Sequence, residues 1–141
     1  MKTHHEIYRS LNQLVPALNL IPIQKEPYVL EKHGETPLCV HISERTADFT
    51  VVNLCQYPRA PHGELVPAPD VEFILSAASK TAKPSIFIDC EQGRVELTEQ
   101  FRREKPQVAQ GLDASIFNWL IKLERQGFKP EKPLNLGSGR E

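Results

Sequence analysis

Five side chains in this sequence have types that could do chemistry together: two thiols, two imidazoles and one amide. They are Cys39, His41, Asn53, Cys55 and His62. A thiol, an imidazole and an amide are the groups of a cysteine-nucleophile triad, and thiols with imidazoles are common zinc ligands. We take these residues as the candidate functional surface.

The sequence does not supply the further residues that a cysteine nucleophile or a zinc site would need. A catalytic thiol needs a cation or a helix N-terminus that lowers its pKa, together with an oxyanion hole, and the sequence around Cys39 predicts neither. A structural zinc site needs four ligands, usually in tight Cys-x-x-Cys or His-x₃-His pairs, and His62 is the one plausible fourth ligand. His4 and His5 are adjacent on a predicted helix and point about 100° apart, so they chelate poorly. The sequence therefore assigns no catalytic, cofactor-binding or metal residue.

A predicted β-hairpin positions four of the five candidates. Aliphatic residues occupy alternate positions over 38–43 and again over 49–56, which indicates two strands with one buried face. The predicted register pairs Ser43 with Phe49 around a five-residue loop, and it sets Val40 opposite Val52. The opposite face then carries Cys39, His41, Asn53 and Cys55, with His41 facing Val51 and Cys39 facing Asn53.

The remaining segments alternate between helical and extended patterns. A capping box at Thr3–Glu6 predicts a helix that ends or kinks near Leu14, before Pro16. A short strand is expected at 28–32, a proline-rich loop at 58–69, a strand at 71–75 and a turn at 76–83. A second hairpin, 85–90 with 94–98, is expected to pair Asp89 with Arg94 and to place Ile86 and Ile88 on the face of Val95 and Leu97.

A closing helix is predicted from Pro106 to Gln126, with Gly127 as its stop. Together these elements predict an α+β fold: an antiparallel sheet of about five to six strands with an N-terminal and a C-terminal helix packed on one face. We expect a single domain over 1–129 and a flexible tail over 130–141. The predicted core consists of Ile7, Leu11, Leu14, Val40, Ile42, Val52, Leu54, Ile116, Leu120 and Leu123.

Composition narrows the function classes. The 141 residues carry a formal net charge of −1, which leaves no electrostatic footprint for nucleic acid. The three cysteines form no regular framework, which favours a reducing compartment, and no apolar run approaches a membrane span. The seven glycines form no phosphate-binding loop. We expect a cytoplasmic protein without a cofactor and without membrane contact.

The order of elements resembles an uncharacterised bacterial family of small proteins found largely on plasmids and phages. Residues 34–38 through 70–73 look like that family's hairpin, polar loop and acidic-then-aromatic strand, and the helix from Trp119 to Phe128 looks like its closing helix. A second uncharacterised family ends in a similar helix. The resemblance implies an accessory role in a mobile element. The preferred function is a non-enzymatic module that binds a protein partner or itself; the alternative is a small metal-binding or cysteine-dependent enzyme.

Overall fold

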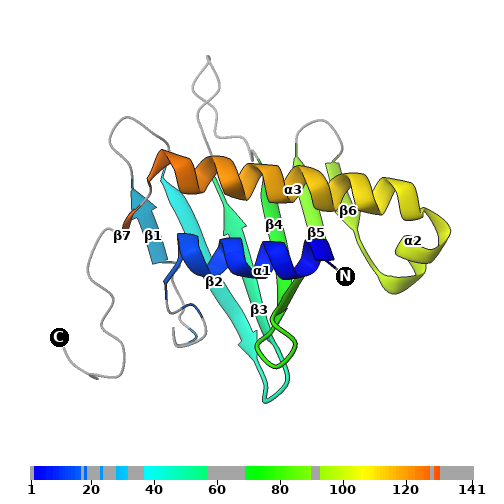
Figure 1. Cartoon of the computed structure of the whole chain (residues 1–141), viewed down its shortest axis with the longest axis horizontal. Helices are drawn as coiled ribbons and strands as arrows, with labels where there is room; N and C mark the ends of the chain where they lie inside the picture. Colours follow the sequence, from blue (N-terminus) through cyan, green and yellow to red (C-terminus); the bar gives the residue numbers. More distant parts are fainter. Residues whose placement is uncertain are drawn as a thin grey trace.

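The computed structural model describes residues 2–16, 18, 23, 28–31, 37–56, 69–89, 93–127 and 129–130 (Figure 1). In chain order the elements are α1 (Lys2–Leu14), β1 (Tyr28–Glu31), β2 (Leu38–Arg45), β3 (Thr50–Cys55), β4 (Asp70–Ser76), β5 (Thr81–Asp89), β6 (Gly93–Glu96), α2 (Glu99–Glu104), α3 (Pro106–Gln126) and β7 (Lys129–Pro130).

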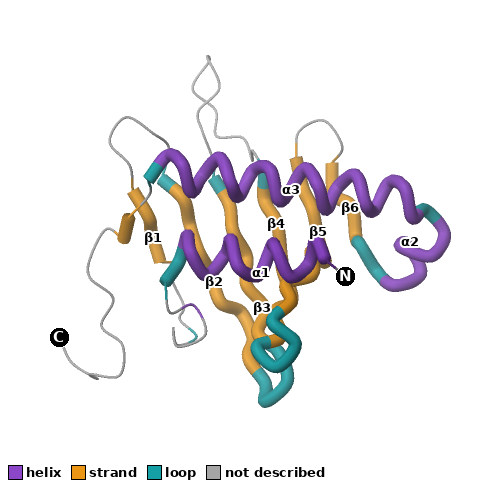
Figure 2. Tube along the Cα trace, in the orientation of Figure 1, coloured by secondary structure: helices purple, strands orange, loops and turns teal. Residues whose placement is uncertain are grey.

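The strands form one antiparallel sheet in the order β6-β5-β4-β3-β2-β1-β7. Strands β1 to β6 are therefore a meander, to which the two-residue β7 adds at the β1 edge. The long helix α3 carries the chain back from β6 to β7 across the sheet, as Figure 2 shows. Its 21 residues span about 31 Å, which matches the roughly 29 Å across seven strands.

Both long helices cover the same face of the sheet, which we call the inner face. Helix α1 runs beside α3 in the same direction (Figure 1). Between helices and sheet lies one apolar core, and every residue of the predicted core is in it, at 4% exposure or less. The α+β class and the packing of both helices on one face are thus confirmed.

The first hairpin has the predicted faces but a different register. Val40 pairs with Leu54 and Ile42 with Val52, two positions away from the prediction. Ser43 is an extra residue, a β-bulge, after which Arg45 pairs with Thr50. The turn between the paired residues Arg45 and Thr50 is therefore shorter than predicted. It is held by the Thr46 hydroxyl, which accepts hydrogen bonds from the backbone N–H groups of Asp48 and Phe49, each at 3.1 Å.

The second hairpin departs further from its prediction. Asp89 pairs with Gly93 rather than Arg94, and Gly93 has φ +69°, which costs glycine little. A bulge at Ser85 reverses the alternation along β5, so Ala82, Pro84 and Phe87 face the core. The prediction that Ile86 and Ile88 share a face with Val95 is therefore wrong: they pair with Glu96 and Arg94 on the opposite face.

Other boundaries moved by a few residues. Thr3 lies inside α1 rather than capping it, and β5 begins at Thr81, within the expected turn. Helix α2 was not predicted; its N-cap is Thr98, whose hydroxyl accepts a hydrogen bond from Phe101 N–H. The closing helix has its predicted bounds, with Gly127 at φ 79° as its C-cap. Of the expected tail, only Pro130 is described, and it pairs with Leu30.

Candidate functional site

The face of the sheet opposite the helices, here the outer face, holds four of the five predicted residues. Cys39 pairs directly with Cys55, and His41 pairs with Asn53. The prediction that these four side chains share one face is confirmed, whereas the predicted pairs, Cys39 with Asn53 and His41 with Val51, are wrong. Parity survives the error because a shift of two residues returns each side chain to the same face. His62 and most of the 58–69 loop lie outside the described residues.

The two thiols do not have the environment of a nucleophile. Both Cys39 and Cys55 are free cysteines; Cys55 is buried and Cys39 is half-buried. Burial raises the pKa of the Cys39 thiol above its ordinary value, and a hydrogen bond with Cys55 lowers it by less. The thiol therefore stays protonated at neutral pH, and thiolate is the form that attacks or binds a metal.

The asparagine amide serves a different partner from the one a triad requires. Asn53 Nδ2 donates to Asp70 Oδ1 at 2.8 Å, and it lies 3.4 Å from the Val71 carbonyl oxygen. On the neighbouring strand, Ser85 Oγ donates to Glu72 Oε1 at 2.8 Å. These bonds join β3, β4 and β5 on the outer face and fix the side chains of Asn53 and Ser85 there.

Asp70, Glu72 and Ser85 are the outer-face residues that sequence reasoning missed. The alternation of Asp70, Glu72 and Ile74 with buried residues along β4 was a signal for the first two. Ser85 had no signal, because its position depends on the bulge. Within the described ranges, no group of three or more histidine, cysteine or acidic side chains could hold a metal ion.

Apolar side chains flank this polar centre. Ile74 is 39% exposed, and Ile86 and Ile88 are half-buried. Val29 and Cys39 continue the apolar surface toward β1 and β2, since Val29 pairs with Cys39. None of the described helices packs on this face. Its aliphatic groups differ in exposure, since Val51, which pairs with Ile74, is 8% exposed.

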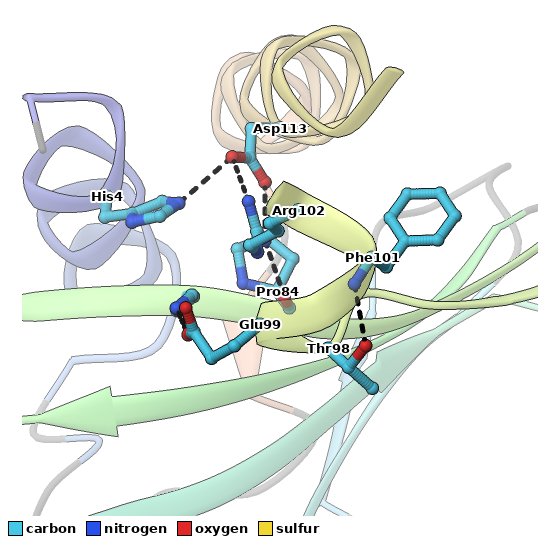
Figure 3. A network of polar contacts seen from close by, with 8 residues as sticks. His4, Pro84, Thr98, Glu99, Phe101, Arg102 and Asp113 are labelled. Carbon is cyan, nitrogen blue, oxygen red and sulfur yellow. Dashed lines mark hydrogen bonds and ion pairs between the residues drawn. The ribbon is translucent and has the colours of Figure 1, made fainter. Parts of the chain in front are cut away.

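A second cluster of polar side chains is buried between the helices and the sheet and contains ion pairs. Asp113 on α3 is 1% exposed and accepts hydrogen bonds from three groups. His4 Nε2 lies 3.0 Å from Asp113 Oδ2, and Arg102 reaches Oδ2 with Nη1 at 2.9 Å and Oδ1 with Nη2 at 3.1 Å, as Figure 3 shows. Arg102 Nη2 also donates to the Pro84 carbonyl oxygen at 2.9 Å. The cluster thus connects α1, α2, α3 and β5.

The charges in this cluster shift two pKa values. Burial of the Asp113 carboxyl favours its neutral form, but hydrogen bonds from His4 and Arg102, and the charge of Arg102, outweigh burial and lower the pKa of Asp113. Burial, with the Arg102 charge, lowers the pKa of Lys83, which forms an ion pair with Glu99. At 1% exposure this carboxylate is not accessible to a substrate, so we assign the cluster to stability.

A sequence signal for this cluster existed. Asp113 stands in the apolar stripe of α3, four residues after Ala109 and three before Ile116, so its carboxylate had to be buried. Its partners, at separations of 109 and 11 residues, could not be identified from periodicity. His4 and His5 do point apart, as expected: His4 is buried against Asp113, and His5 is exposed and bonds to the Lys80 carbonyl.

Comparisons with known proteins found no similar sequence or structure. No family model matches the sequence, and searches of curated proteins and of solved structures gave no match. The described helices include none with the length and apolar character needed to cross a membrane.

Proposed function

We propose that this protein is a non-enzymatic interaction module that binds a protein partner through the outer face of its sheet. The observation that carries the proposal is the set of partly exposed aliphatic side chains, Ile74, Ile86 and Ile88, on a face that no described helix covers. Apolar groups gathered on one exposed surface are typical of protein-binding sites.

The charges of the outer face favour a different protein over a second copy. Asp70 and Glu72 lie in the first half of β4, directly beside the aliphatic groups, since Asp70 pairs with Ile88 and Glu72 with Ile86. Stacking two copies of this face about a two-fold axis would bring these carboxylates close to their counterparts, and like charges at an interface are costly. A partner that presents basic groups beside an apolar patch would satisfy both. Self-association is the second outcome that the experiment below distinguishes.

The test compares an outer-face variant with a matched control on the helical side. Ile74→Asp places a charge on the outer face, and Val108→Asp does the same on α3, where Val108 is 50% exposed. Both positions are exposed, so each change should alter the free energy of unfolding by less than about 1 kcal/mol. The wild-type chain and both variants serve as bait in an extract of the native host, and each retained protein is purified and its affinity measured.

We expect a partner that binds the wild-type chain and Val108→Asp but loses affinity for Ile74→Asp. Equal retention of every partner by all three chains would reject the outer face as the binding surface. Sedimentation equilibrium supplies the second readout. If the wild-type chain is a dimer and Ile74→Asp alone makes it a monomer, the partner of the outer face is a second copy of this chain and not a different protein.

The enzymatic alternative is tested on the same protein. A metal-binding or cysteine-dependent enzyme using Cys39, His41, Asn53 and Cys55 requires stoichiometric zinc in protein purified without chelators, or a Cys39 thiol that alkylates unusually fast at neutral pH. We expect neither, because burial raises the pKa of Cys39. Either signal would replace the interaction module with the enzyme.

We also propose a cytoplasmic location and an accessory role in a bacterial or mobile-element system. The location is supported by the three cysteines of the sequence, an odd number without the regular spacing of a disulfide framework. The accessory role rests on the resemblance of the hairpin and closing helix alone. Fractionation of host cells, and a search for the gene's transcripts in cells with and without the mobile element, test the two parts.

A further inference from the structure

A cavity lies between the exposed side of α1 and the turn at 77–80 that joins β4 to β5. Its volume is about 530 Å³, within the range of small-molecule binding sites. The described lining residues come from two segments far apart in sequence and include no carboxylate: His5, Tyr8, Arg9, Asn12, Gln13 and Lys80. The cavity is separate from the outer face, since α1 packs on the inner one.

A hydrogen bond holds the two walls of the cavity together. His5 Nδ1 lies 3.0 Å from the Lys80 carbonyl oxygen. A carbonyl oxygen only accepts, so Nδ1 carries the proton and donates, which leaves Nε2 as an acceptor in the neutral ring. Arg9 follows His5 by four residues, one turn along the same face of α1. The bond therefore positions the turn that carries Lys80 beside the helix face that carries Arg9.

The backbone at Lys80 has a left-handed conformation, which is uncommon for a lysine. Lys80 has φ 56°, and among the described residues it is the one non-glycine with positive φ. Glycine adopts this conformation freely, whereas a lysine adopts it at a cost. Strained backbone of this kind gathers at binding sites, where the retained side chain has a use.

Two positive charges line the cavity without a compensating acid. Among the described residues, neither Arg9 nor Lys80 forms an ion pair with a carboxylate. Together they carry two charges, which a phosphate monoester, with a charge of −1.5 to −2 at pH 7, would balance. A carboxylate would balance only one. The Arg9 guanidinium also matches phosphate geometry in a bidentate manner.

We propose that this cavity binds a small phosphate monoester. Arg9 and Lys80 hold the phosphate group, and the exposed amide of Gln13 supplies a further donor. The organic part lies beside Tyr8, whose ring is half-buried, since the cavity is far larger than a phosphate ion requires. This proposal is independent of the protein-binding role of the outer face.

The test uses the full chain and four simple probes: phenyl phosphate, inorganic phosphate, benzoate and phenol. Backbone amide signals of residues 5–13 and 77–81 are followed by NMR during each titration. We expect saturable shifts with phenyl phosphate, weaker binding of inorganic phosphate, and affinities about tenfold lower for benzoate and phenol. Absence of shifts in these segments, or equal affinity for phenol or benzoate, would overturn the proposal.

Three variants give the decisive comparison. Arg9→Gln and Lys80→Gly should each weaken binding of phenyl phosphate about tenfold, because each removes one charged hydrogen-bond partner. Lys80→Gly should at the same time raise the melting temperature of the free protein, since glycine relieves the strain at φ 56°. Arg103→Gln, at an exposed position on α2, is the matched control and should leave affinity unchanged. A Lys80→Gly chain that binds as tightly as the wild type would refute a ligand role for Lys80.

Discussion

Replacing Asp113 with asparagine should destabilise the protein more than any surface change of similar size. The substitution keeps the shape of the side chain but removes its charge and one acceptor. Arg102, whose side chain is 13% exposed, would then keep the Pro84 carbonyl oxygen as its one full acceptor, and its Nε has no partner among the described residues. Removing one partner of a buried ion pair typically costs 3–5 kcal/mol, and the oxygen that asparagine retains places the expected loss at about 3 kcal/mol.

The assay is urea denaturation followed by the fluorescence of Trp119, the single tryptophan, which is half-buried on α3. With a slope of about 2 kcal/mol per molar urea, the midpoint should fall by about 1.5 M. The paired variant Arg102→Met with Asp113→Leu removes both charges and should recover most of the loss, since apolar groups can replace a buried ion pair. A midpoint shift below about 0.5 M for Asp113→Asn would refute the inference that the ion pair is buried and intact.

The pH dependence of the same comparison has a definite sign. The pKa of Asp113 is lowered in the folded protein, so its contribution to stability is complete above its unfolded pKa of about 3.9. The contribution is lost as the pH falls from there through the folded-state pKa. The difference in stability between wild type and Asp113→Asn should therefore be constant near neutrality and shrink below about pH 4. A difference that already declines between pH 7 and pH 5 would indicate another titrating group.

Three further outcomes are expected. Leu120→Ala, at a side chain with 0% exposure, should lower the free energy of unfolding by about 2–5 kcal/mol in the same urea assay, and an unchanged midpoint would contradict the packing of α3. His41→Gln on the outer face should change it by less than about 1 kcal/mol, because an amide retains a donor and an acceptor; a larger loss would mean that the imidazole has a structural role. A chain that ends at Lys129 loses one pairing among the described residues, Pro130 with Leu30, and should still unfold cooperatively by calorimetry, whereas a broad transition would show that later residues support the fold.

Alternation in the sequence predicted the faces of β2 and β3 because side chains alternate regardless of register. It failed at the register itself. The hydrogen bonds of Thr46 and the bulge at Ser43 determine the length of the turn and hence the register. Neither can be recognised in a hydrophobic pattern. Along β5 the bulge at Ser85 also inverted the faces, so even the parity argument was wrong there.

The candidate sites were predictable to different degrees. Cys39, His41, Asn53 and Cys55 were grouped correctly, because they lie on two consecutive strands. The cavity at α1 could not be found, since it depends on a backbone conformation at Lys80 that residue type disfavours. Long-range partners are invisible to local periodicity, and the buried cluster and the cavity both depend on them.

The contacts between α1 and α3 determine when α1 can complete its packing during synthesis on the ribosome. His4 bonds to a residue 109 positions later, and Ser10 Oγ bonds to Glu124 at a separation of 114. At roughly 5–20 residues per second, a ribosome needs about 5–20 s to add that much chain. For that interval the apolar residues of α1 have no α3 to pack beside. The packing of α1 is thus completed only after α3 has been synthesised. Ribosome-bound chains that stop before Asp113 should therefore bind chaperones that recognise exposed apolar segments, while released chains that contain α3 should not.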